Sequence, residues 1–153
     1  MNRIGAVADG IGKGLVAGFA GTAAMTVSST LEARLRKRAP STAPARATAR
    51  MLGIREFDSA LAEARWNDLS HWGYGTGWGV VRGLLATAGL SPKAATAAHG
   101  AAVYGAAQVT LPALEIAPPS IFWGKEEVAI DAFHHAVYAA ATGLAYMIIE
   151  GRD

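Results

Sequence analysis

Four stretches dominated by Ala, Gly and aliphatic residues limit the possible folds of this chain more than any other feature. They are residues 10–31, 69–90, 93–114 and 127–149. A bilayer core about 30 Å thick is crossed by roughly 20 mostly apolar helical residues. Hydrophobic residues make up 52% of the 153 residues and charged residues only 17%, against about 25% charged in a typical soluble domain. We therefore expect an all-α fold, an integral membrane bundle of about four transmembrane helices forming one domain over residues 1–153.

Glycines repeated every fourth residue favour this interpretation over the alternative, a soluble helical bundle. They are Gly10, Gly14 and Gly18 in the first stretch and Gly75, Gly79 and Gly83 in the second. Each interior glycine costs a soluble helix up to about 1 kcal/mol relative to alanine, whereas small residues at this spacing let membrane helices approach closely. The pattern predicts a glycine zipper, with glycine faces that could also bind a second copy or another membrane protein.

Prolines mark the ends of the later stretches. Ser91 followed by Pro92 is a helix N-cap with proline at the first helical position, which predicts a short turn and an antiparallel hairpin between the second and third helices. Pro112 predicts a kink or the end of the third helix. Pro118 and Pro119 predict a loop before the fourth helix, with anchoring aromatic residues that follow directly.

The distribution of basic residues predicts the orientation in the membrane. Eight of them lie in the connection 32–68, namely Arg34, Arg36, Lys37, Arg38, Arg46, Arg50, Arg55 and Arg65. Basic loops stay in the cytoplasm, so we expect a cytoplasmic connection and both termini outside.

Two interpretations of this connection are open. Its first basic cluster, Arg34, Arg36, Lys37 and Arg38, could contact anionic lipid headgroups, followed by an amphipathic helix over 47–67 on the membrane surface. It could equally be a stop-transfer cluster and a surface helix without a ligand. Nucleic-acid binding is not expected, because acidic residues interleave and no aromatic stacking surface is evident.

The last stretch carries a polar stripe. Glu127, Asp131, His135 and Tyr138 share one helical face that rises roughly 16 Å from its cytoplasmic edge. Ionisable residues inside a membrane are rare and point to function by default, so the stripe could pass protons or hold a cation. The alternative is a hydrogen-bond network that only fixes the helix in the bundle.

An arginine in the second stretch is the other ionisable residue that needs a partner. Arg82 would be costly alone in the membrane, and we expect it to pair with Asp9. The alternatives are pairing with Asp131 or snorkelling outward to lipid phosphate, and in a proton or cation relay Arg82 would be the charge partner of the stripe.

Histidines provide the only candidates for a metal or haem site, because the chain has no cysteine. His71, His134 and His135 are weak candidates, since His71 and His135 would need the same depth in the membrane. His99 belongs near the opposite face. We expect no cofactor, and a haem- or metal-binding bundle is the alternative.

The C-terminal pattern resembles that of the YagU-like family of small bacterial inner-membrane proteins. The matching residues are Pro118, Pro119, Glu127, Asp131, Phe133, His135, Val137 and Tyr138. The resemblance is specific over 112–138 and looser over 10–40, while the middle of the chain departs from it. It implies a small multispanning protein of the bacterial cytoplasmic membrane and supplies no reaction.

No catalytic motif accompanies these features. The chain has no G-x-S-x-G elbow, H-E-x-x-H pair or phosphate-binding lysine loop, and we expect no enzyme activity. The leading hypothesis is an accessory or scaffolding membrane protein. The alternatives are proton or cation handling by the polar stripe and, third, the cofactor-binding bundle.

Overall fold

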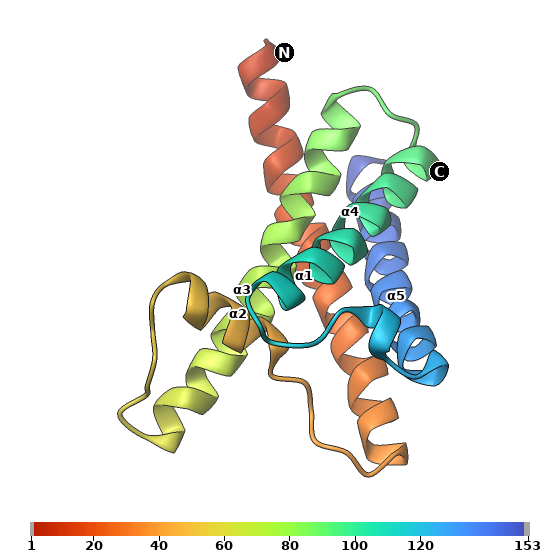
Figure 1. Cartoon of the computed structure of the whole chain (residues 1–153). Helices are drawn as coiled ribbons and strands as arrows, with labels where there is room; N and C mark the ends of the chain where they lie inside the picture. Colours follow the sequence, from red (N-terminus) through yellow and green to blue (C-terminus); the bar gives the residue numbers. More distant parts are fainter. Residues whose placement is uncertain (1, 152–153) are drawn as a thin grey trace.

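The computed structural model describes residues 2–151, which form five α-helices, a short 3-10 helix and no strand. The helices are α1 (Arg3–Leu35), α2 (Ala43–Met51), α3 (Ala60–Thr87), α4 (Pro92–Ala113), η1 (Ser120–Phe122) and α5 (Lys125–Glu150) (Figure 1). The all-α class is confirmed, and each of the four long helices contains most of one predicted stretch. Residues 1, 152 and 153 of the predicted domain lie outside the described residues.

α1 runs antiparallel to both α3 and α5, and α3 and α5 therefore run parallel to each other. The first half of α1 lies against the second half of α3, and its C-terminal end lies against the start of α5. α4 completes the arrangement by packing against α3 and α5, and it crosses the other helices obliquely in Figure 1. Polar groups from α1, α3, α4 and α5 therefore share one interior.

Local signals set the predicted ends of α3 and α4. α3 ends at Thr87 and α4 begins at Pro92, so the predicted hairpin is confirmed. The Ser91 hydroxyl caps α4 by accepting a hydrogen bond from the Ala94 amide at 3.4 Å. α4 continues through Pro112 and ends at Ala113, close to the predicted position. Glu115, with φ of +53°, turns the backbone there, and the Ile116 amide donates to the Leu111 carbonyl at 2.9 Å and closes the helix end.

Glycine contacts bring α1 and α3 close together. Gly10 faces Gly83, and Gly14 and Gly18 face Gly79. A Cβ atom built on Gly18 would lie 2.6 Å from the Thr76 carbonyl oxygen, inside any normal contact. These glycine faces are therefore taken up by contacts within the chain.

The predicted single helix over 47–67 is wrong. α2 ends at Met51 because Gly53, with φ of +72°, turns the backbone into the left-handed region. The amide of Ile54 then donates to the Ala49 carbonyl at 2.9 Å and closes the helix end. Ser59 caps a new helix, so the second half of the predicted surface helix is the first part of α3.

Two of the described helices, α1 and α5, are long and apolar enough to cross a membrane by length and composition. Both also expose large apolar side chains along their length. On α1 and α5 these include Val16, Phe19, Val27, Leu31, Phe133, Leu144 and Ile148. The surface of these two helices is thus apolar where that of a soluble helix is usually polar.

Candidate functional site

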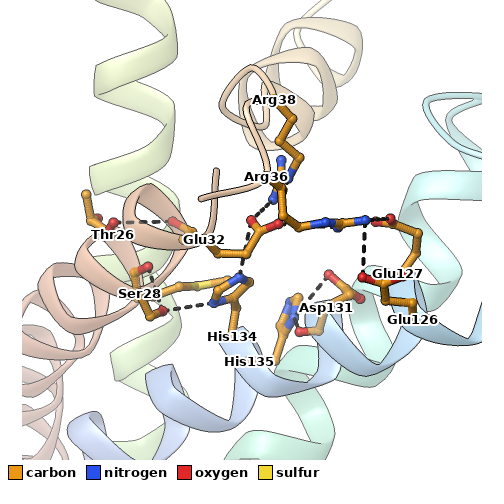
Figure 2. Close-up of polar contacts among 12 residues, drawn as sticks. Thr26, Ser28, Glu32, Arg36, Arg38, Glu126, Glu127, Asp131, His134 and His135 are labelled. Carbon is orange, nitrogen blue, oxygen red and sulfur yellow. Dashed lines mark hydrogen bonds and ion pairs between the residues drawn. The ribbon is translucent and has the colours of Figure 1, made fainter. Parts of the chain in front are cut away.

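A charged cluster joins the end of α1 to the start of α5 (Figure 2). Arg36, the C-cap of α1, donates to the Glu127 carboxylate at 2.5 Å and lies 3.6 Å from that of Glu126. Arg38 donates through Nε to Glu32 at 2.9 Å. The carboxylate of Glu127 raises the pKa of the Arg36 guanidinium, and that of Glu32 raises the pKa of Arg38. Glu127, the first residue of the predicted stripe, is therefore held at the surface by an arginine of another helix.

A buried histidine lies directly beneath this cluster. His134 is 5% exposed, and its Nδ1 lies 2.9 Å from the Ser28 hydroxyl. The Ser28 hydroxyl can also donate to the Met25 carbonyl at 3.0 Å, so which of Ser28 and the histidine ring donates in their own bond depends on the ring tautomer. The other ring nitrogen, Nε2, lies 3.7 Å from a Glu32 oxygen and has no hydrogen bond.

The predicted stripe on α5 does not act as one chain of contacts. Asp131 accepts a hydrogen bond from Gln108 of α4 at 3.3 Å. His135 Nδ1 lies 2.8 Å from the Asp131 carbonyl and 3.5 Å from its carboxylate, and the ring stacks edge-on against Tyr104. Together with the Glu127–Arg36 pair, these contacts divide the stripe between two neighbouring helices.

Tyr138, the last member of the stripe, belongs to a different set. Its hydroxyl donates to the Gly75 carbonyl of α3 at 2.6 Å. His134, Tyr138, Thr142 and Tyr146 follow each other at every fourth residue of α5, and all four are buried. The sequence analysis missed this inner stripe, although the four-residue spacing of imidazole and hydroxyl groups was a signal that could have found it.

Arg82 lies near the far end of the inner stripe. It is 1% exposed, and its guanidinium carbon lies 4.4 Å from the centre of the Tyr146 ring, a cation–π contact. The predicted partner Asp9 instead forms an ion pair with Lys13 at 2.5 Å, one turn along α1. Asp131, the other candidate partner, contacts Gln108 and His135, whereas Arg82 contacts Tyr146.

The candidate metal ligands are separated by their hydrogen bonds. His71 Nε2 lies 2.8 Å from the Thr26 hydroxyl, which itself donates to a backbone carbonyl. His134 faces α1, and His135 faces α4. Among residues 2–151, no three His, Asp or Glu side chains gather as a metal site would require.

The predicted lipid-headgroup cluster is divided in the same way. Arg34 and Lys37 are exposed, and within the described part of the chain their side chains make no ion pair or hydrogen bond. Arg36 and Arg38 are bound to carboxylates of the charged cluster. Only two of the four cations of the predicted lipid-headgroup cluster are therefore available to a ligand.

Comparison with known proteins adds no assignment: no family model, curated protein or solved structure matches this chain.

Proposed function

We propose that this chain is a multi-pass membrane protein in which α1, α3, α4 and α5 all cross the bilayer. One observation carries the proposal: large polar side chains lie in the interior and large apolar side chains lie on the surface, the reverse of a soluble protein. The five largest fully buried side chains are Arg82, Tyr146, His99, Thr22 and Thr142. The exposed side chains of α1 and α5 include valine, leucine, isoleucine and phenylalanine. Water penalises this arrangement, whereas lipid favours it.

The same observation explains why α3 and α4 have modest hydropathy. Arg82 of α3 and His99 of α4 are 1% and 0% exposed, so neither charge nor imidazole faces the surroundings. His99 Nε2 lies 3.1 Å from the Trp78 carbonyl of the neighbouring helix. A hydropathy average counts these side chains although they would not meet lipid, and it therefore understates the apolar character of the outer surface.

The interior supports a structural role more strongly than a transport role. Thr22, Thr26 and Ser28 can each donate their hydroxyl proton to a carbonyl of α1, and Tyr138 donates to Gly75 of α3. The first three bonds lie within α1, and the Tyr138 bond joins α5 to α3. A hydroxyl that donates to a fixed backbone carbonyl does not readily pass a proton onward. We infer an accessory or scaffolding component, a YagU-like protein of the bacterial inner membrane, with the basic connection in the cytoplasm and both termini outside.

Single-cysteine labelling tests the topology, and the chain offers a clean background because it has no cysteine. Ser41 and Ala88 are both exposed and lie in connections at opposite ends of the bundle. In a bacterial host, a membrane-impermeant maleimide should label Ala88→Cys in intact spheroplasts and Ser41→Cys only after lysis. Equal labelling of both variants, or release of the protein by alkaline carbonate, would refute the membrane topology.

Proton handling is the second candidate, because His134 Nε2 is buried and faces the Glu32 carboxylate without a hydrogen bond. It predicts proton flux into proteoliposomes under a potassium diffusion potential, reported by an internal pH dye. Glu32→Gln and Asp131→Asn should then abolish flux while the protein keeps its fold. A wild-type flux equal to that of empty liposomes would exclude this function and leave the structural role.

A further inference from the structure

The basic residues of the connection are not equivalent once their contacts are known. Residues 33–55 contain seven arginines and lysines and no acidic residue. Arg36, Arg38 and Arg50 are bound to carboxylates of Glu127, Glu32 and Glu115, respectively. The side chains of Arg34, Lys37, Arg46 and Arg55 are exposed and make no ion pair or hydrogen bond with any of the residues 2–151. These four cations are available to a ligand outside the chain.

Two of these cations flank an exposed apolar pair at the end of α2. Met51 and Leu52 are 67% and 68% exposed, with Arg46 before them and Arg55 after them. The turn at Gly53 ends the helix directly beyond this pair. Apolar side chains flanked by cations are typical of a helix that lies in the headgroup region of a membrane.

Contacts with the bundle fix the level of α2 along the helices. The Thr48 hydroxyl lies 2.7 Å from that of Ser70, and Trp66 donates to the Ala45 carbonyl at 3.0 Å. Arg50 donates to the carbonyl of Leu114, the C-cap of α4. The apolar stretches of α3 and α4 begin and end at this level, so α2 lies where a bilayer core would meet the headgroups.

We propose that the outer edge of α2 (Arg46, Met51, Leu52 and Arg55) is a binding site for anionic phospholipid. The two arginines contact the headgroup phosphate, and the two apolar side chains enter the boundary of the acyl chains. The proposal rests on the membrane location proposed above. It moves the lipid site away from the end of α1, where half of the predicted cations are bound to carboxylates of the chain itself.

Native mass spectrometry of the full chain in detergent tests this site. Dioleoyl phosphatidylglycerol should bind more tightly than dioleoyl phosphatidylcholine. Arg46→Gln with Arg55→Gln should weaken phosphatidylglycerol binding by about tenfold or more, since each cation contributes roughly fivefold near an anionic surface. Arg3→Gln with Lys93→Gln is the matched control, because it removes the same charge from exposed residues at the opposite end. The control should keep the wild-type affinity within about twofold.

Several results would overturn the proposal. Equal affinity of the wild type for both lipids would do so, as would equal losses in the two double variants, which would indicate a response to net charge alone. Competition by glycerol 3-phosphate as effective as that by the lipid would replace the lipid site with a simple anion site. A dimer abolished by Met51→Ser with Leu52→Ser would make a second copy the occupant.

Failure of the lipid site can be told apart from failure of the membrane proposal. Carbonate extraction of the Arg46→Gln, Arg55→Gln variant and of the wild type reports on membrane integration alone. Retention in the membrane without phosphatidylglycerol preference refutes only the α2 site, whereas extraction of the wild type refutes the membrane location. The thermal midpoint of the variant in detergent should equal that of the wild type, because both side chains are exposed and neither has a hydrogen bond or ion pair within residues 2–151.

Discussion

Replacing Gly79 with alanine is expected to disrupt the α1–α3 contact on which the bundle is built. A Cβ atom built on Gly79 would lie 2.7 Å from the Gly18 Cα and 2.8 Å from its amide nitrogen. These atoms are backbone, so they cannot rotate away, and the two helices must separate. A gap of about 0.5–1 Å forfeits roughly a quarter to a half of the dispersion energy of the atoms concerned.

The magnitude follows from two opposing effects. Overpacking of a close contact costs about 1–3 kcal/mol, whereas alanine in place of glycine in a helix stabilises by up to about 1 kcal/mol. We expect Gly79→Ala to lower the free energy of unfolding by about 1–2 kcal/mol. Gly77 is the matched control, because it lies two residues away in α3 and its Cβ would meet open space. Gly77→Ala should be neutral or slightly stabilising.

The assay is unfolding of the purified protein in dodecyl maltoside micelles by increasing mole fractions of sodium dodecyl sulfate, followed by circular dichroism. The difference between the two variants isolates the close approach, since the change in helix propensity is the same in both. Equal stability of Gly79→Ala and Gly77→Ala would refute the reasoning that α1 and α3 touch through their backbones.

Two further predictions use the same assay, and a third examines cofactors. His134→Ala should cost about 2 kcal/mol because it removes a buried side chain together with its hydrogen bond to Ser28. His135→Ala, whose ring is partly exposed, should cost less than about 1 kcal/mol; the opposite order would make the predicted stripe of Glu127, Asp131 and His135 the important one. Tyr138→Phe should cost about 0.6–1.7 kcal/mol, the range for a hydrogen bond between membrane helices, because the Gly75 carbonyl loses its donor; an unchanged midpoint would count against this bond. The absorption spectrum of protein purified from membranes should contain no Soret band, and a stoichiometric band would return His71 to the role of a ligand.

Local signals explain why the helices and their ends could be predicted. The spacing of apolar and small residues identified the four long helices, and Pro92 and Pro112 act on the backbone within one turn of their own positions. The same reasoning failed for residues 47–67, where the continuous apolar spacing hid the left-handed turn at Gly53. A helical period alone does not reveal a break that depends on one backbone angle.

The sequence could not show which polar stripe of α5 is buried, because the predicted stripe that begins at Glu127 and the inner stripe that begins at His134 both have helical spacing. Which of them is buried depends on the helices packed against α5. Ser28 of α1 and Gly75 of α3 provide the polar partners that draw His134 and Tyr138 inward. Those partners are 106 and 63 residues away in the chain, beyond the reach of any local pattern.

The sequence by itself determined the helical class, the long apolar segments and the concentration of positive charge in one connection. These properties follow from composition and from interactions within a few residues. The tertiary structure alone decided which charges are bound to each other and which remain available. Arg36 is paired with Glu127 across 91 residues, whereas Arg46, ten residues further along, has no such partner. A charge is neutralised by whatever the fold brings within a few ångströms, because screening and solvent weaken its effect beyond that distance.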